Sequence, residues 1–362
     1  MEWNWQHLNW PDFRFDAQAL QPLESKFLQG SGFLTGTVRH LNDSDHEQLT
    51  IELISDEALK TSEIEGEHLD RESLQSSIRK AFGLQFDESR RIPAAERGIT
   101  AMMVDLYRNF DQPLSHQTLF RWHRHLLAAR KDLSDIGRYR TSGETLQIVS
   151  GAVHAPKVHF EAPPSTQVPH EMERFLNWYR SSRQTSPLIR SAIAHLYFLA
   201  IHPFIDGNGR IARALSEKLL AETVGQPTLF ALAQTIERDR KNYYQALHAT
   251  NRSLNIDPWL EYFARTVIRA QATSLQKAEW LIAKAKLFDR LDRQLNPRQE
   301  KVLRRLFSAG PDGFKGGLSA ENYIALTKTS RATATRDLQD LVAKGALRRT
   351  GQLKHTRYWL QP

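Results

Sequence analysis

Cysteine is absent from the 362-residue chain. Its absence excludes disulfide bonds, thiol chemistry and metal sites built on cysteine, and the chain needs no oxidising compartment. The sequence also lacks an N-terminal basic stretch followed by an apolar run, and no segment approaches the run of about 18 apolar residues typical of a membrane span. We therefore expect a cytoplasmic protein with no membrane contact.

Charge is distributed unevenly along the chain. The whole sequence carries 49 Lys and Arg against 41 Asp and Glu, a formal net charge of +8. Residues 296–362 alone hold 13 of the cations and 5 of the anions, which is also a net charge of +8, and the rest of the chain balances at 36 against 36. A neutral body with a basic tail predicts two functional units, and the length allows two or three domains.

The most informative segment is HPFIDGNGRIAR, from His202 to Arg213. The glycine-rich turn at 207–209 permits backbone conformations whose N–H groups surround an anion at the positive end of the helix expected to follow. Arg210 and Arg213 are three residues apart, so both can reach phosphate oxygens from the first turn of that helix. Asp206 is suited to hold Mg²⁺ against phosphates, and His202 is suited to accept a proton from a hydroxyl.

Each of these residues also has an ordinary interpretation when it is taken alone. A histidine at a helix end is commonly a cap, and Gly-Asn-Gly is commonly a turn. The combination predicts a site that moves a phosphate-linked group, because a turn requires neither an arginine pair nor a carboxylate and a histidine at fixed offsets.

HPFIDGNGRIAR resembles the signature of the Fic family, HPFx(D/E)GNGRxxR, at every fixed position. The resemblance implies a mainly α-helical fold and the transfer of AMP from ATP to a hydroxyl of a target protein, a reaction called AMPylation. It implies that His202 is the general base and Asp206 the Mg²⁺ ligand. It further implies that the ATP phosphates are bound by Gly207, Asn208, Gly209, Arg210 and Arg213.

The segment TSEIEGE, residues 61–67, fits the inhibitory pattern of the same family, (S/T)xxxE(G/N), through Thr61, Glu65 and Gly66. In Fic proteins of this kind the glutamate pairs with the second arginine of the signature, here Arg213, and blocks the seating of the γ-phosphate. A bidentate carboxylate–guanidinium pair competes directly for the donors that phosphate needs. The alternative is a solvated acidic helix start with Thr61 as its N-cap.

Two further segments resemble parts of a Fic nucleotide site. A short hairpin is expected from the extended character of LQIV and KVHF between residues 137 and 178, with an ordinary surface hairpin as the alternative. As a Fic flap, it would hold a target segment by strand-like pairing through Val158, His159, Phe160 and Glu161. RKNYYQALHATN predicts a helix whose Tyr243, Tyr244 and Asn251 would line the adenine and ribose pocket, although buried tyrosines are more often core residues.

The N-terminal opening is rich in aromatic residues, which we expect to pack it onto the Fic body. This aromatic cluster consists of Trp3, Trp5, Trp10, Phe13 and Phe15. We predict a helical domain with the inhibitory motif at 1–95, the catalytic core at 96–260, a connecting helix at 261–295 and a tail domain at 296–362.

The tail has the order helix, helix, helix, hairpin and resembles a winged helix-turn-helix. Its polar and basic segment 330–336 is typical of a recognition helix, and Lys354, His355 and Arg357 suit a wing. One interpretation is DNA binding, and the other is the use of the fold for dimer contacts or target binding.

The sequence therefore predicts a protein adenylyltransferase that uses ATP and Mg²⁺, is autoinhibited through Glu65 and modifies a Ser, Thr or Tyr hydroxyl. The target can be another protein or the chain itself. Two alternatives at the same site are removal of AMP and transfer of another phosphate-linked group. An alternative of another class is a nucleotide-sensing, DNA-binding regulator, and formation of a homodimer stays open.

Overall fold

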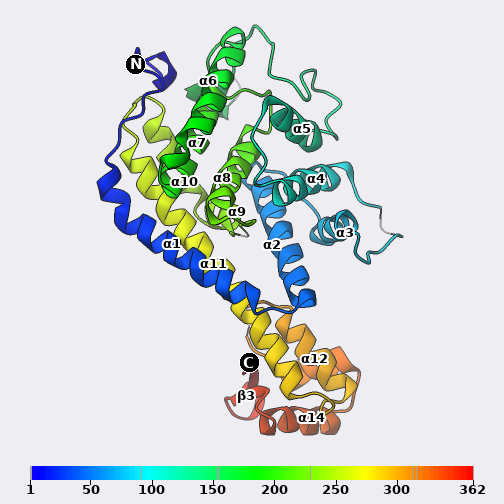
Figure 1. Cartoon of the computed structure of the whole chain (residues 1–362). Helices are drawn as coiled ribbons and strands as arrows, with labels where there is room; N and C mark the ends of the chain where they lie inside the picture. The colour runs from blue at the N-terminus through cyan, green and yellow to red at the C-terminus, as the bar shows by residue number, and fades with distance from the viewer. Residues whose placement is uncertain are drawn as a thin grey trace. The chain divides into compact units, whose positions relative to one another are not determined.

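The computed structural model describes residues 2–89, 91–152, 155–228, 230–311, 313–314 and 316–361, with the backbone alone at 150–152, 155, 156 and 354. It is mainly helical and divides into two compact units (Figure 1). The first unit comprises residues 1–33 and 50–274, and the second comprises residues 34–49 and 275–362. Within the described ranges, no helix combines the length and the apolar character needed to cross a membrane.

The first unit contains, wholly or in part, eleven helices and one hairpin among its described residues: α1 (Ala17–Arg39), α2 (Asp43–Ile64), α3 (Arg71–Ala81), α4 (Ala94–Arg108), α5 (His116–Leu126), β1 (Gln147–Ala152), β2 (Ala155–Glu161), α6 (Val168–Ser181), α7 (Pro187–Ile201), α8 (Asn208–Val224), α9 (Leu232–Arg238), α10 (Arg240–Thr250) and α11 (Asp257–Arg290).

Helices α7 and α8 lie side by side at the centre of this unit (Figure 1). α7 is almost wholly apolar and is buried along nearly its whole length. It ends at Ile201, as predicted from the proline at 203, because the residue before a proline disfavours the α-helical conformation. α8 starts directly after Gly207 and ends at Gly225, which adopts a left-handed conformation with φ of 73°.

Four of the five N-terminal aromatic residues, all but Phe15, pack onto this body as the sequence predicts. Trp3 and Trp10 belong to the main hydrophobic core, and Trp5 and Phe13 pack against it. The Trp10 indole also donates to Glu171 on α6 at 2.8 Å. The segment that follows forms helix α1, which continues to residue 39.

The predicted hairpin is present as antiparallel strands β1 and β2. Gln147 pairs with Glu161 and Ile148 with Phe160, and a bulge follows between Ile148 and Val149. The connecting helix predicted at 261–295 is also present, as α11, but it begins at residue 257 and ends at residue 290.

The tail elements in the second unit are α12 (Pro297–Phe307), α13 (Ala320–Thr327), α14 (Arg331–Ala343), β3 (Leu347–Thr350) and β4 (Arg357–Leu360). Asn296, Ser319 and Ser330 each cap the helix that follows, through a side-chain oxygen that accepts a backbone N–H. The three helices and the hairpin enclose a separate apolar core. The side chain of Lys354, expected in the wing, lies outside the described part of the chain.

Candidate active site

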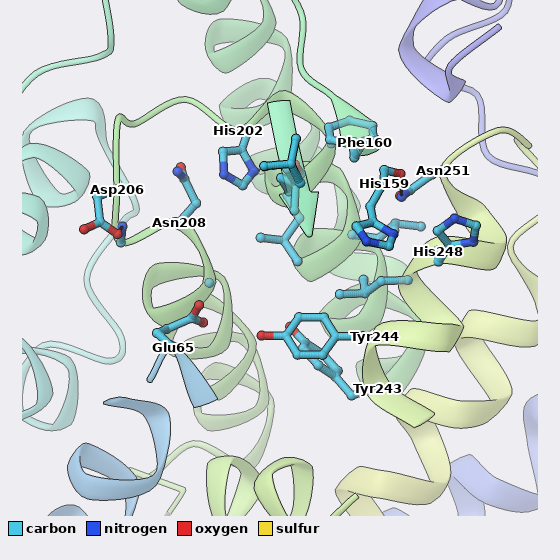
Figure 2. A pocket seen from close by; sticks show the side chains of 18 of the residues that line it. Glu65, His159, Phe160, His202, Asp206, Asn208, Tyr243, Tyr244, His248 and Asn251 are labelled. Atoms are coloured by element: carbon cyan, nitrogen blue, oxygen red, sulfur yellow. Dashed lines mark hydrogen bonds between the residues drawn. The ribbon is translucent and has the colours of Figure 1, made fainter. Parts of the chain in front are cut away.

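A cavity of about 620 Å³ brings together segments that are far apart in the sequence (Figure 2). Its walls come from the residue after α2, the hairpin, the end of α7, the start of α8 and helix α10. The volume lies within the range of small-molecule and cofactor sites. The predicted site residues in its lining are Glu65, His159, Phe160, His202, Asp206, Gly207, Asn208, Gly209, Tyr243, Tyr244 and Asn251.

His202 presents one free ring nitrogen to this cavity. It caps α7 in a left-handed conformation with φ of 48°, and its Nδ1 lies 3.2 Å from the carbonyl oxygen of Leu199. Because a carbonyl can only accept, Nδ1 carries the proton and Nε2 holds the lone pair. Burial lowers the pKa of His202 to about 4, so the ring is neutral and able to accept a proton near pH 7.

Arg140 holds the backbone beside His202, a contact that sequence reasoning did not anticipate. Its Nε donates to the carbonyl of His202 at 2.9 Å, and its backbone N–H donates to the carbonyl of Pro203 at 3.0 Å. Its guanidinium also donates to the carbonyl of Pro163. The pattern GRYR carries no signal for this role, because nothing in the sequence shows which backbone lies opposite Arg140.

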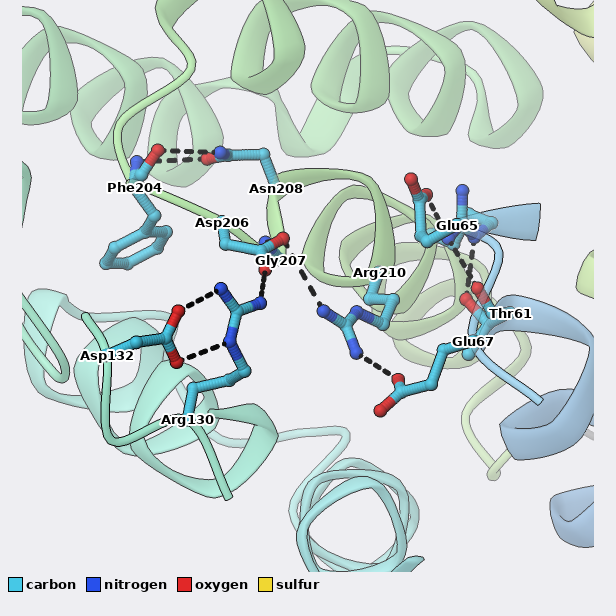
Figure 3. Close-up of polar contacts among 11 residues, drawn as sticks. Thr61, Glu65, Glu67, Arg130, Asp132, Phe204, Asp206, Gly207, Asn208 and Arg210 are labelled. Carbon is cyan, nitrogen blue, oxygen red and sulfur yellow. Dashed lines mark hydrogen bonds and ion pairs between the residues drawn. The ribbon is translucent and has the colours of Figure 1, made fainter. Parts of the chain in front are cut away.

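The glycine-rich turn has the expected shape, and the side chain of Asn208 has a further task that the sequence did not predict. Gly207 adopts φ of 80° at the N-cap of α8, a conformation that glycine tolerates best. The side chain of Asn208 points back, where Oδ1 accepts from the Phe204 N–H at 3.0 Å and Nδ2 donates to the Phe204 carbonyl at 2.8 Å (Figure 3). It therefore braces the turn, which leaves only the backbone of Asn208 available for a phosphate.

Replacing Asn208 with alanine is expected to lower the free energy of unfolding by about 2–4 kcal/mol, because it leaves two buried backbone groups of Phe204 without partners. Urea titration of the two proteins measures the difference. Asn242→Ala removes an exposed asparagine on α10 and should change stability by no more than about 0.5 kcal/mol. A loss below about 1 kcal/mol in the Asn208 variant would contradict the bracing role.

Arg213 is bound by the end of α2. Its Nε donates to Thr61 Oγ1 at 2.7 Å, and its Nη2 donates to the Thr61 carbonyl at 3.0 Å and to Glu65 Oε1 at 2.7 Å. The expected bidentate pair is wrong, because Glu65 supplies one oxygen and Thr61 supplies the other acceptors. The N-cap interpretation of Thr61 is also wrong, since this residue lies in the last turn of α2. Arg213 Nη1 is buried and has no hydrogen-bond partner within the described part of the chain.

Two glycines permit the close approach of Glu65. The chain leaves α2 through Gly66, whose φ of 83° is readily adopted only by glycine. On the opposite side, a Cβ atom placed on Gly209 would lie 2.2 Å from Glu65 Oε1. The absence of a side chain at Gly209 therefore makes room for the carboxylate.

The other arginine of the signature is also paired with this segment, which the sequence analysis did not foresee. Arg210 Nη1 lies 2.6 Å from Glu67 Oε2, and the Arg210 side chain is only 7% exposed (Figure 3). The signal was present in TSEIEGE, whose last residue is a second glutamate two positions after Glu65. Both phosphate-binding candidates, Arg210 and Arg213, thus face carboxylates from one segment.

Asp206 lies at the edge of the cavity and is held by cations. Arg130 Nη1 is 3.0 Å from its Oδ2, and Arg210 Nη2 is 3.6 Å from its Oδ1. No group of three potential metal-ligating side chains occurs within the described residues. A lone carboxylate beside a phosphate site fits Mg²⁺, which commonly takes its remaining ligands from phosphates and water, provided that Arg130 releases Oδ2.

The two tyrosines of α10 differ in their surroundings. Tyr243 is buried, and its hydroxyl is 2.9 Å from Nε2 of His195 on α7, so it serves the core even though it also lines the cavity. Tyr244 is 42% exposed, and its hydroxyl donates to the carbonyl of Ile64 at 3.4 Å. Tyr244 is therefore the better candidate for stacking on a base.

The flap residues are tied to the N-terminal segment and to the end of α10. Phe160 is buried against Trp3, with ring centroids 5.5 Å apart. Trp5 Nε1 donates to the carbonyl of Glu161 at 2.7 Å, and the side chain of Asn251 donates to the carbonyl of His159 at 3.1 Å. A target segment that pairs with β2 through the carbonyls of His159 and Glu161 would have to share these acceptors with Asn251 and Trp5. The remaining flap residue, Val158, packs against the main core.

Comparison with known proteins identifies the domain that carries this cavity. Residues 113–220, from just before α5 to within α8, match the model of the Fic/DOC family. This stretch is a Fic domain. The segment in front of it, residues 3–84, matches a second model that is described only as a domain of unknown function, DUF4172. Residues 61–67, which carry the predicted inhibitory motif, therefore lie in the preceding region and outside the stretch that matches the Fic/DOC family.

Curated relatives of the Fic domain are named protein adenylyltransferases. Protein adenylyltransferase fic-1 of Caenorhabditis elegans is 25% identical over 185 residues, which is 51% of this chain and 33% of the relative. Protein adenylyltransferase Fic of Nematostella vectensis is 31% identical over 149 residues, 41% of this chain and 31% of the relative. The chain thus spans about a third of the length of these two relatives.

A solved structure shares the fold beyond the Fic domain. A Fic family protein from Desulfovibrio desulfuricans G20 superposes with a TM-score of 0.54 at 20% sequence identity, covering 94% of this chain and 96% of that one. At this identity the likeness establishes the fold alone.

Proposed function

We propose that this protein transfers AMP from ATP to a Ser, Thr or Tyr hydroxyl of a target protein, and that Glu65 and Glu67 restrain the reaction. The observation that carries the proposal is the neutral His202, whose Nε2 holds the lone pair and which lines a cavity together with the glycine-rich turn at 207–209. The names of the adenylyltransferase relatives support the same reaction class.

The reaction needs little covalent chemistry from the protein. The target hydroxyl loses its proton to His202 Nε2 and attacks the α-phosphorus, a new P–O bond forms, and the bond to the bridging oxygen breaks to release diphosphate. The backbone of residues 207–209 and the two arginines bind the phosphates and neutralise their charge. Asp206 would hold Mg²⁺, which supplies further neutralisation of phosphate charge when bound.

The arrangement around Arg213 supports autoinhibition. Glu65 accepts from Nη2 of this arginine, and the Thr61 side chain accepts from Nε, while Nη1 is buried with no partner among the residues that the structure describes. A phosphate that binds Arg213 must displace the carboxylate, since both compete for the same guanidinium donors. ATP therefore binds productively only when the end of α2 moves away and Glu65 releases Arg213.

Labelled nucleotides test the reaction class directly. In a cell lysate, addition of the Glu65→Gly variant should increase protein labelling from ATP labelled at the α-phosphate above that of the lysate alone, whereas it should add no labelling from ATP labelled at the γ-phosphate. Label from the γ-phosphate would instead indicate a phosphate transfer and contradict the proposal. Mass spectrometry of the labelled bands should show an added AMP.

The pH dependence of transfer follows from the lowered pKa of His202. Because this pKa is about 4 rather than the usual 6.5, the ring stays neutral as the pH falls from 8 to 5.5, and it protonates only near pH 4. The ratio kcat/KM of the Glu65→Gly variant should therefore show no acid-side decline due to His202 at about pH 6–7. The ATP phosphates also titrate in this pH range. The affinity of the His202→Ala variant for ATP, measured from pH 8 to 5.5, gives the pH dependence that is due to the nucleotide and not to His202. A remaining decline with an apparent pKa of about 6.5 would contradict the assignment.

A further inference from the structure

We infer that the second unit binds double-stranded DNA through the exposed face of α14 and the hairpin β3–β4. Helices α13 and α14 are joined by three residues, Lys328 to Ser330, which is the length of the turn in a helix-turn-helix. The hairpin follows α14 directly and pairs antiparallel. This order is that of a winged helix-turn-helix, in which the second helix of the pair enters the major groove.

The composition of α14 fits a groove-binding helix. Its exposed positions fall on one face at helical spacing and contain no acidic residue. These positions are Arg331, Ala332, Thr335, Arg336, Gln339 and Ala343. Arginine and glutamine are side chains that hydrogen-bond base edges or phosphates, and threonine can do either. Ala334, which the sequence placed with the recognition residues, is instead buried in the core of the unit.

The acidic residues of α14 are turned away from this face and neutralised. Asp337 is buried and accepts from Arg298 at 2.8 Å and from the Tyr323 hydroxyl at 2.9 Å. Asp340 accepts from Gln299 at 2.7 Å. The acidic residues of α14 itself therefore do not offset Arg331 and Arg336 on its exposed side, where a phosphate backbone can meet these two cations.

One exposed carboxylate lies close to the face. Glu321 on α13 is 3.6 Å from Arg331, and the two side chains are 69% and 81% exposed. An ion pair at this distance and with this exposure contributes little to stability. A phosphate oxygen can therefore replace the carboxylate as the partner of Arg331.

The hairpin extends the basic surface. Arg348 and Arg349 on β3 are exposed, as is His355 in the connection between the strands. Leu353, at the tip of this connection, is 91% exposed. An apolar side chain between basic residues is suited to contact sugars or to insert in a minor groove beside the helix.

The same surface fits a protein partner poorly. Apart from Leu353, the second unit exposes no large apolar side chain in the residues that the structure describes. Protein interfaces centre on buried aromatic or apolar anchors, which the α14 face does not offer. Phosphate and base contacts need only the cations and amides that are present.

Fluorescence anisotropy with a labelled duplex of mixed sequence, about 25 base pairs long, tests the inference on the full chain at several salt concentrations. The unaltered protein should bind and lose affinity steeply between 50 and 200 mM salt. The double variant Arg331→Ala/Arg336→Ala should bind about tenfold or more weakly. Its slope of log affinity against log salt should be smaller by about 2, because about two phosphate contacts are lost.

The matched control removes the same charge elsewhere in the unit. Arg304→Ala/Arg305→Ala takes two exposed arginines from α12 and should change the affinity by less than about threefold. An equal loss in both variants would show attraction by net charge alone and overturn the α14 assignment. Absence of binding at 50 mM salt, or tighter binding to single- or double-stranded RNA of the same length, would overturn DNA as the partner. Glu65→Gly should leave DNA binding unchanged, so this test is independent of AMP transfer.

Discussion

AMP transfer by the Glu65→Gly variant is expected to exceed that of the unaltered protein by about tenfold to a hundredfold, seen as stronger labelling of the protein itself and of targets. The substitution removes the charged hydrogen bond to Arg213, and such a bond contributes about 1.5–3 kcal/mol. It also clears the space over Gly209 that the carboxylate fills. Arg213 can then bind the phosphates of ATP without a competitor.

The second carboxylate should add to this effect. Glu67→Ala frees Arg210 from a contact of 2.6 Å, and the double variant Glu65→Gly/Glu67→Ala should transfer more AMP than Glu65→Gly alone. Because Glu67 is 39% exposed, its own contribution is expected to be the smaller one. If the double variant transfers AMP no faster than Glu65→Gly, Glu65 alone restrains the reaction.

A neighbouring glutamate provides the control for these variants. Glu63 also lies at the end of α2, but it pairs with Lys60 rather than with the signature arginines. The rate of AMP transfer by Glu63→Ala should stay within about twofold of the rate of the unaltered protein.

Nucleotide binding provides a second check on the Glu65 variant. The affinity for ATP should rise in Glu65→Gly more than the affinity for AMP, since only ATP carries the γ-phosphate whose seating Glu65 is proposed to block. Equal increases for both nucleotides would indicate general loosening of the site.

The same variants separate transfer of AMP from its removal. If Glu65 positions water to release AMP from a modified protein, Glu65→Gly should slow the loss of label from a protein that already carries AMP. Unchanged loss of label together with faster transfer would assign Glu65 to inhibition alone.

The second large effect is expected at His202. In the Glu65→Gly background, His202→Ala should lower AMP transfer by about a hundredfold to ten-thousandfold, because the target hydroxyl loses the base that accepts its proton. The KM for ATP should change little, since the phosphates are bound by the turn and the arginines. Transfer from ATP labelled at the α-phosphate measures both parameters.

A surface histidine of the same domain serves as the matched control. His170 lies exposed on α6, and His170→Ala should leave transfer within about twofold. Undiminished transfer in His202→Ala would contradict the base assignment. A large rise in KM with unchanged kcat would instead place His202 among the residues that bind the nucleotide.

Local patterns were sufficient to predict most elements. The apolar helix before Pro203, the helix after Gly207, the hairpin near residue 150 and the tail helices follow from proline, glycine and capping residues close by in the chain. The signature also predicted which side chains would gather near a phosphate site, because its residues are neighbours in one short segment. The roles of these residues in AMP transfer stay predictions until the variants are measured.

Contacts between distant segments could not be predicted in this way. Arg210 meets Glu67 across 143 residues of chain, and Arg213 meets Thr61 across 152. The assignment of Tyr243 to the core depends on His195, which lies on a different helix. Such partners depend on how helices pack, and no local pattern contains that information.

The sequence by itself determined which chemical groups are available, namely a histidine, a glycine-rich turn, two arginines and a glutamate, because these reside in two short motifs. The tertiary structure alone decided how they act on one another. Packing of the end of α2 against the start of α8 brings two carboxylates onto both arginines, and burial keeps the ring of His202 neutral with its Nε2 free. Proximity and burial are properties of the folded chain, and for that reason they emerge only in three dimensions.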